Sequence, residues 1–231
     1  MQVHVGMSGF AYKEWKGNFY PKDLAADDML EFYSTRFSTV EMNNTFYRMP
    51  SEKTLLQWAG SVPEGFTFAL KASRRITHHA RLGNVGDLLD YVVRNAAILG
   101  PKLGPLLFQL PPTMKKDLDR LRVFLTLLPP TWKIALEWRH PSWEDEEVYG
   151  LLRSHGVAAV TSEFDDPVPL LRSSTSWGYL RLHRAGYTPD DLRKWLDRIA
   201  DQQWEECFVY FKHEEDIAGP ERAQVFAGLL R

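Results

Sequence analysis

Apolar residues gather in eight short runs along the chain, and most of these runs are separated by segments in which apolar residues repeat at helical spacing. The runs have the length and composition of buried strands, and they lie at residues 3–8, 38–43, 66–71, 105–110, 133–139, 156–163, 178–183 and 207–212. One helical segment places an apolar stripe on a single face, formed by Leu88, Leu89, Val92, Val93 and Ala96. This alternation of strand and helix predicts an α/β fold with a parallel sheet.

Two further helices are marked by residues that favour helix ends. Thr188 is followed by Pro189 and two acids, which is typical of a helix start. The buried face of that helix is expected at Leu192, Trp195, Leu196 and Ile199. Ser142 and Gly156 are expected to bracket another helix. Residues 164–177 are short and interrupted by proline, so the helix after the sixth strand is expected to be degraded.

The pattern over residues 1–231 therefore predicts one domain. We expect an α/β, TIM-like (β/α)₈ barrel with a degraded sixth helix. No linker or low-complexity segment divides it. An open, doubly wound sheet shows the same alternation, but a sheet covered by helices on both sides is apolar on both faces. Here one face of the strands is apolar and the other is small or polar, which favours a barrel.

Side chains alternate between the two faces of a strand, so the sequence indicates which residues enter the lumen of the barrel. The polar face carries Glu137 and Arg139 in one strand, and Arg181 and His183 in another. These groups concentrate toward the carboxyl ends of the strands, where barrels place their active sites. We expect Glu137, Arg139 and Arg181 to form a wet, ligand-facing group; a buried ion cluster is the alternative.

Composition and charge limit the partners and the cellular compartment that can be expected for the protein. The formal net charge is -2, so the chain as a whole does not attract nucleic acid or anionic membranes. Cys207 is the only cysteine, which excludes an intrachain disulfide and favours a reducing compartment. The start lacks the features of a signal peptide, and no apolar run reaches the length of a membrane helix. We therefore expect a cytoplasmic protein with no membrane partner.

Three residues on the polar face are candidates for catalysis: Glu41, Glu137 and His183. The two carboxylates lie on strands two and five, so they can project into one lumen and act as an acid/base pair. The alternative is that each carboxylate is held in a buried ion pair with a lysine or arginine and does not react.

Cations at the strand ends outnumber these acids and favour an anion-binding site, formed by Lys71, Arg139, Arg181 and Lys212. Other substrate contacts are expected from polar and aromatic residues of the same rim: Asn43, Gln109, Tyr47, Trp15 and Tyr187. Aromatic rings can stack on a base or a sugar, and the alternative is an apolar collar that closes the top of the barrel.

A metal site is a weaker possibility. His4, His183, Glu41 and Glu137 have suitable ligand atoms, but they are scattered over separate strands and lie near cations. We expect neither a metal nor another cofactor. The sequence also lacks a phosphate-binding glycine loop, a Gly-x-Ser-x-Gly elbow and a paired-cysteine motif.

Seven long stretches carry a resemblance to a known family, among them MSGFAYKEWKGNFYP (7–21), VEMNNTFYRMP (40–50) and ALEWRHPSW (135–143). In order and over nearly the whole chain, they resemble the domain-of-unknown-function family 72, the YecE-like family. The resemblance implies a TIM-like barrel and no particular reaction. Lys212-His213 stands where the family usually has Asn-Asn, and Arg184 where it commonly has glycine. Both changes are expected to add positive charge at the mouth.

Together these features predict an enzyme with an anion-binding site at the barrel mouth. It is expected to act on a phosphorylated or nucleotide-like substrate by acid/base or hydrolytic chemistry. The first alternative is a non-catalytic barrel that binds an anionic metabolite or nucleic acid, for which the basic loop 73–81 is the relevant feature. The second alternative is a metal-dependent hydrolase or isomerase. The sequence does not indicate an oligomeric state.

Overall fold

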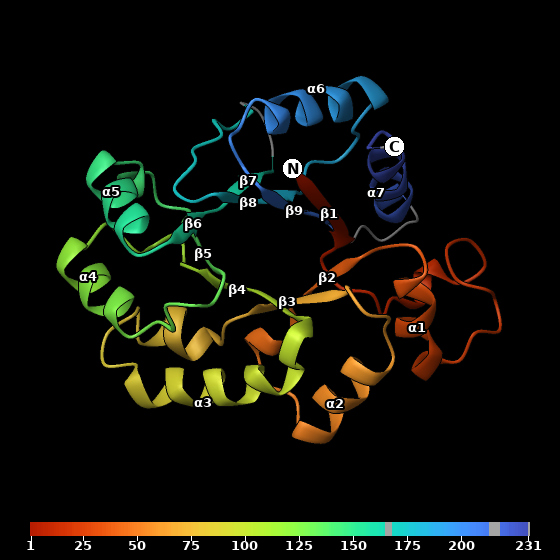
Figure 1. The fold of residues 1–231 in the computed structure, drawn as a ribbon, viewed down its shortest axis with the longest axis horizontal. Coiled ribbons are helices and arrows are strands. Elements are labelled where there is room, and N and C mark those ends of the chain that lie inside the picture. Colours follow the sequence, from red (N-terminus) through yellow and green to blue (C-terminus); the bar gives the residue numbers. More distant parts are fainter. Residues whose placement is uncertain (165–167, 213–217, 231) are drawn as a thin grey trace.

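The computed structural model describes residues 1–164, 168–212 and 218–230. The strands found there form one parallel sheet in the order β6-β5-β4-β3-β2-β1-β9-β8-β7. Their bounds are β1 (Gln2–Met7), β2 (Thr39–Met42), β3 (Thr67–Lys71), β4 (Leu103–Gln109), β5 (Ile134–Glu137), β6 (Val157–Ala159), β7 (Thr161–Glu163), β8 (Trp177–Leu182) and β9 (Glu206–Phe211). The sheet curves into a barrel with helices around it (Figure 1).

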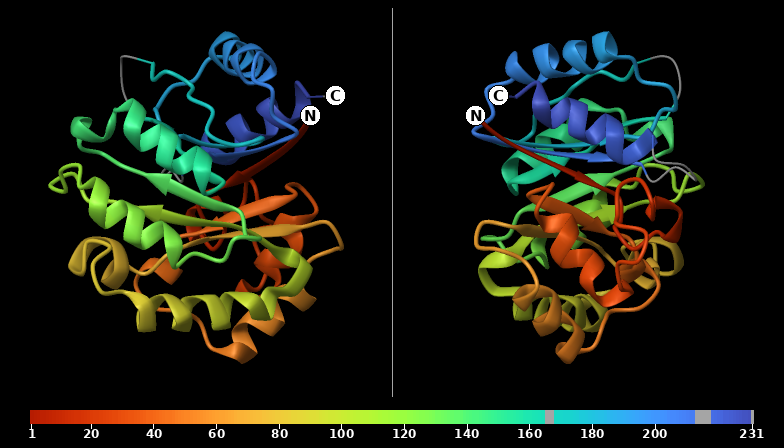
Figure 2. Two further views of the ribbon diagram at one scale, coloured as in Figure 1. Left: turned by 60° about the vertical axis from the view of Figure 1, so that its left-hand side comes forward. Right: turned by 90° about the vertical axis from the view of Figure 1, so that its right-hand side faces the viewer.

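The helices of this outer layer follow the strands in sequence. They are α1 (Met29–Ser34), α2 (Glu52–Gly60), α3 (Gly86–Ala96), α4 (Leu118–Thr126), α5 (Glu146–Ser154), α6 (Pro189–Ala200) and α7 (Ala218–Gly228). The last helix packs against both β1 and β9, so the two ends of the chain lie side by side (Figure 2). None of the described helices is both long and apolar enough to cross a membrane.

The barrel closes through a break in its sixth strand. β6 pairs with β5, and β7 pairs with β8, while only Val160 separates β6 from β7 in the chain. Ser174 covers the free side of β6: its Oγ donates to the Val157 carbonyl and accepts from the Ala159 amide, both at 2.8 Å. The predicted TIM-like barrel is confirmed, with the expected strand 156–163 divided into two short ones.

The predicted helices are confirmed except at one boundary. No helix follows β7 within residues 168–176, in agreement with the degraded sixth helix (Figure 1). α6 starts as expected, with Thr188 as its cap. α5, however, begins at Glu146 with Asp145 as its cap, and not after Ser142. Trp143 is fully buried and its indole donates to a backbone carbonyl, so the chain forms a short separate turn before the helix starts.

Two layers of buried side chains confirm the predicted alternation of faces. The outer layer packs the strands against the helices, and it includes Val40, Phe68, Leu136, Leu180 and Val209. The inner layer fills the lumen, with Ala69, Leu107, Ala135, Ala158, Trp177, Tyr179, Phe208 and Tyr210. The lower lumen is therefore a packed core, and polar groups are concentrated above it at the carboxyl ends of the strands.

Candidate functional site

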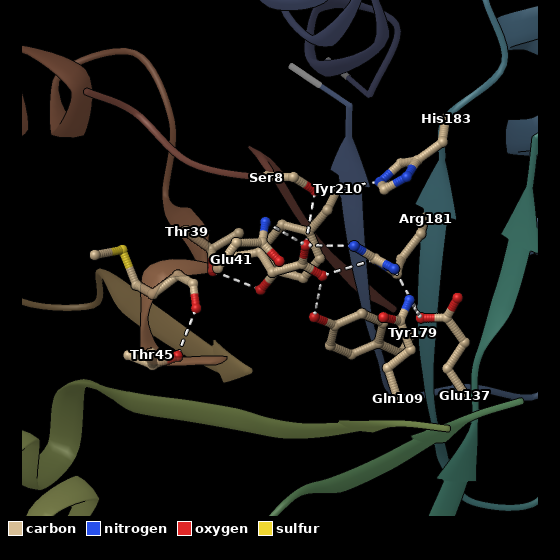
Figure 3. Close-up of polar contacts among 12 residues, drawn as sticks. Ser8, Thr39, Glu41, Thr45, Gln109, Glu137, Tyr179, Arg181, His183 and Tyr210 are labelled. Atoms are coloured by element: carbon tan, nitrogen blue, oxygen red, sulfur yellow. Dashed lines mark hydrogen bonds and ion pairs between the residues drawn. The ribbon is translucent and has the colours of Figure 1, made fainter. Parts of the chain in front are cut away.

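Arg181 extends from β8 into the lumen and lies between two carboxylates from other strands (Figure 3). Its Nε and Nη2 each donate to Glu41 at 3.0 Å, and its Nη1 donates to Glu137 at 2.7 Å. Arg181 is 4% exposed, and both carboxylates are fully buried. The expectation of a wet group is wrong for Arg181 and Glu137, because the barrel encloses them as a buried ion cluster.

Glu41 is the most completely bonded member of this cluster. Besides Arg181, its Oε1 accepts from Ser8 Oγ at 2.8 Å and Asn43 Nδ2 at 3.1 Å, and its Oε2 accepts from Tyr179 at 2.7 Å. Burial alone would raise the pKa of Glu41, but the charge of Arg181 and these hydrogen bonds lower it to about 2. Glu41 is therefore a permanent carboxylate that holds Arg181 in place.

Glu137 is less completely bonded, and its two oxygens differ. Oε2 accepts from Arg181 and from Gln109 Nε2, the latter at 3.0 Å. Oε1 has no hydrogen-bond donor among the described residues, and it forms a looser ion pair with Arg139 Nε at 3.5 Å. A buried carboxylate oxygen without a donor is costly. Oε1 is thus the least satisfied oxygen of the two carboxylates.

His183, at the top of β8, is held as a neutral imidazole of one tautomer. Ser8 has a single hydroxyl hydrogen, which it donates to Glu41, so Ser8 Oγ must accept from His183 Nε2 at 3.2 Å. Burial and the charge of Arg181 lower the pKa of His183 well below its ordinary value. His183 is therefore uncharged at neutral pH, and Nδ1 is the ring nitrogen that carries the lone pair.

Two cations lie above the ion cluster and are supported by aromatic rings. Lys71 Nζ is 4.4 Å from the centre of the Phe46 ring, and the Arg139 guanidinium is 4.6 Å from that of Phe164. Arg139 is 39% exposed and Lys71 is half-buried. Burial and the nearby Arg181 lower the pKa of Lys71 to about 8. Lys212 is exposed, and its charge reaches His183, so it belongs to the same rim.

The structure does not bring all of the expected aromatic contacts to the site. Trp15 is fully buried in an aromatic cluster with Tyr12, Phe19 and Tyr20. Tyr187 is buried and donates to the Glu163 carboxylate. Trp15 and Tyr187 therefore belong to a packed aromatic collar, the alternative to ligand contact, because neither ring has a face open to a ligand. Tyr47, in contrast, is 67% exposed.

One of the residues considered for a metal, His4, lies at the other end of the lumen from the rest. His4 lies at the amino end of the lumen, where it stacks on Phe208 and contacts Glu206 at 2.8 Å, whereas Glu41 and His183 lie at the carboxyl end. Within the described chain, no three His, Cys, Asp or Glu side chains are gathered closely enough to hold a metal ion.

One expected charge at the mouth is compensated. Arg184 forms ion pairs with Glu163 at 3.4 Å and Asp191 at 3.1 Å, so the expectation that it adds positive charge there is wrong. The other substitution, at Lys212-His213, is described only at Lys212, because His213 lies outside the described residues.

Three residues of the site, Ser8, Tyr179 and Phe164, were not expected there from the sequence. Ser8 and Tyr179 lie on the predicted lumen face, and an inspection of neutral polar side chains on that face would have found them. Phe164 lies in a connecting segment, where no periodic pattern indicates position, whereas Phe46 belongs to the rim aromatics and His78 to the basic loop that the sequence already indicated. His78 packs edge-on against Phe46 at 4.9 Å, which brings the basic loop 73–81 to the mouth.

A side cavity of about 280 Å³ adjoins the mouth at Arg139. Ser162, Phe164 and Arg172 also line it, and it lies next to the segment that replaces the sixth helix. Ser162 Oγ is buried and has no hydrogen-bond partner in the described chain. Arg139 therefore borders an open volume on one side of the barrel wall.

Comparisons with known proteins agree with the fold. The profile of the family described as "Protein of unknown function DUF72" matches residues 4–231. The UPF0759 protein YunF of Bacillus subtilis is 27% identical over 156 residues, covering 64% of this chain and 54% of that relative, so the match spans about half of the relative's length. A DUF72 crystal structure from Thermotoga maritima is 25% identical, with a TM-score of 0.86 and coverage of 100% and 99% of the two chains. Another from Enterococcus faecalis is 17% identical, with a TM-score of 0.85 and coverage of 99% and 95%.

Proposed function

The chain belongs to the DUF72 family, and we propose that the carboxyl end of its barrel is the active site of an enzyme for a phosphorylated or nucleotide-like substrate. The observation that carries this proposal is the placement of Lys71 and Arg139. Both are accessible cations above a buried cluster, and neither has a hydrogen-bonded carboxylate among the described residues. The two carboxylates below are already bound to Arg181. An anionic ligand would complete the charge balance of the mouth.

In this proposal, binding and proton transfer belong to different residues. Lys71, Arg139 and Lys212 bind the anionic group, and the side cavity beside Arg139 receives another part of the substrate. His183 accepts a proton at Nδ1, and Glu137 Oε1 is a second proton site. Glu41 is a positioning residue, because it touches Arg181 and Tyr179 and its bonding capacity is filled.

The ion cluster also favours the alternative of a non-catalytic barrel for an anionic metabolite. Glu41 and Glu137 are both ion-paired to Arg181, which is what a purely structural cluster requires. The two functions differ in turnover. A binding protein would show saturable affinity without product, whereas an enzyme would release product from at least one member of a substrate panel.

Two measurements test the proposal. First, phosphate should raise the melting temperature more than chloride does at equal ionic strength, because a bound anion stabilises the folded state. Equal shifts would count against an anion site. Second, a panel of phosphatase, nuclease and lyase substrates should reveal a turnover that His183→Gln strongly reduces. Saturable binding with no turnover in the panel would favour the non-catalytic alternative.

A further inference from the structure

Lys71 differs from the other cations of the mouth in its surroundings. It ends β3 on the lumen side, half-buried, with its ammonium above the ring of Phe46. The carboxylates of the cluster are bonded to other cations: Glu41 to Arg181, and Glu137 to Arg181 and more loosely to Arg139. No ion pair to Lys71 is found in the described part of the chain, where the contact given for its amine is the ring of Phe46.

The neighbours of Lys71 disfavour its charged form. Burial is the largest effect, and the nearby guanidinium groups of Arg181 and Arg139 add repulsion, which Glu41 and Glu137 offset only in part. With a pKa of about 8, roughly one Lys71 in ten is a free amine at pH 7, against about one in 3,000 for a lysine at the ordinary value of 10.5. His78, on the same Phe46 ring, also has a lowered pKa, through burial and then the charge of Lys71.

We propose that Lys71 is a nucleophile that forms an imine with an anionic aldehyde or keto acid bound at the mouth. This inference rests on the proposed function, narrows its substrate class to anionic carbonyl compounds, and assigns Lys71 to the carbonyl group, which leaves Arg139 and Lys212 to bind the anionic group. Arg139 lies close enough to affect Lys71 and would hold the phosphate or carboxylate, while the amine faces the carbonyl carbon. Glu137, whose charge also reaches Lys71, has one oxygen that accepts from no donor in the described chain and can relay a proton.

The reaction balances without an oxidant or a reductant. The lone pair of Nζ attacks the carbonyl carbon, a C–N bond forms, and the carbonyl oxygen takes up a proton. Nζ loses one proton when the carbinolamine forms. The hydroxyl group then takes up a proton and leaves as water when the C–O bond breaks, and Nζ gives up its last proton. The products are a Lys71 imine and one molecule of water. An arginine at this position could bind an anion, but it remains protonated and could not carry out this step.

Reductive trapping tests the inference on the full chain. The protein is incubated with sodium cyanoborohydride and one of three probes: glycolaldehyde phosphate, pyruvate or neutral propanal. Peptide mapping by mass spectrometry then locates the modified lysines. The anionic probes are expected to label Lys71 at least about tenfold more than the exposed Lys194 of α6, because the lowered pKa of Lys71 leaves more of its amine unprotonated and Arg139 holds the probe beside it. Lys71→Arg should lose this adduct, and the matched control Lys194→Arg should keep it.

The outcomes separate this inference from the proposed function. Absence of a Lys71 adduct with all three probes, while phosphate still raises the melting temperature, overturns the imine and leaves the anion site standing. Equal trapping of propanal and the anionic probes at Lys71 supports the nucleophile and counts against the anion site.

A second measurement uses only the wild-type protein and does not depend on the folding of a variant. Competitive labelling with acetic anhydride over a range of pH reports the deprotonation of each lysine. Lys71 should titrate near pH 8. Titration of Lys71 at the ordinary lysine value would overturn the inference.

Discussion

Arg181 and Glu137 are joined by a hydrogen bond of 2.7 Å between a guanidinium and a carboxylate that are both shielded from solvent. The bond connects β8 to β5 across the lumen, and Glu41 holds the opposite edge of the same guanidinium from β2. The upper lumen is therefore a charged but enclosed layer, and the accessible chemistry lies directly above it.

Glu137→Gln keeps the shape of the side chain but removes half of this pair. Because a buried charge then lacks part of its compensation, we expect the free energy of unfolding to fall by about 3 kcal/mol. Urea denaturation at pH 7 measures the change. Glu64→Gln, at an exposed position, is the control and should stay within about 0.5 kcal/mol of the wild type. A Glu137→Gln protein as stable as the wild type would indicate that Glu137 lies in a hydrated, ligand-facing site and not in a buried ion cluster.

Because the pKa of Glu41 is lowered in the folded protein, we expect the protein to lose stability in acid. The pKa of Glu41 is about 2 in the folded protein and 4.5 as the reference, so its contribution is complete above pH 4.5 and is lost as the pH falls through about 2. The full effect is about 3 kcal/mol, which is the free energy of the pKa difference. Urea denaturation between pH 5 and pH 2 follows the loss, and carboxyl NMR follows Glu41 itself. A Glu41 titration near 4.5 would contradict this account.

Arg139→Gln is expected to weaken anion binding and to leave the stability of the fold nearly unchanged, unlike Glu137→Gln. Arg139 is 39% exposed and its ion pair is loose, so its removal should change the free energy of unfolding by less than about 1 kcal/mol. The extra stabilisation by phosphate over chloride should largely disappear. Arg153→Gln on α5 removes a similarly exposed arginine away from the mouth and should keep that difference. Retention of the phosphate effect by Arg139→Gln would remove Arg139 from the anion site.

Gly6 and Gly150 form a matched pair for testing the packing of the barrel. A Cβ at Gly6 would lie 2.1 Å from the Thr39 carbonyl oxygen of β2, so Gly6→Ala must push two paired strands apart. We expect a loss of more than about 3 kcal/mol. At Gly150, inside α5, nothing lies within 4 Å of the new atom, and Gly150→Ala should stabilise the protein by about 0.5–1 kcal/mol. Thermal and urea unfolding of both variants measure these changes, and a well-folded Gly6→Ala protein would show that the strands can separate.

The sequence by itself determined the elements and their faces. Strand and helix have different periods, so the order of elements, the stripe on α3 and the lumen side of each strand could be read before any contact was known. The cap at Thr188 is also local, since the capping residue and the amide that it binds lie three residues apart.

Tertiary structure alone decided which polar residues meet and how deeply they lie. The alternation of side chains fixes the face of a strand but not its height in the barrel, so the pattern placed Arg139 and Arg181 alike. Barrel closure buries Arg181 against carboxylates 44 and 140 residues away, and leaves Arg139 at the rim. In the same way, the partners of Arg184 and the burial of Trp15 depend on loops packed by other elements. Ion pairing and solvent exposure are properties of the assembled barrel, because each needs groups that are distant in sequence.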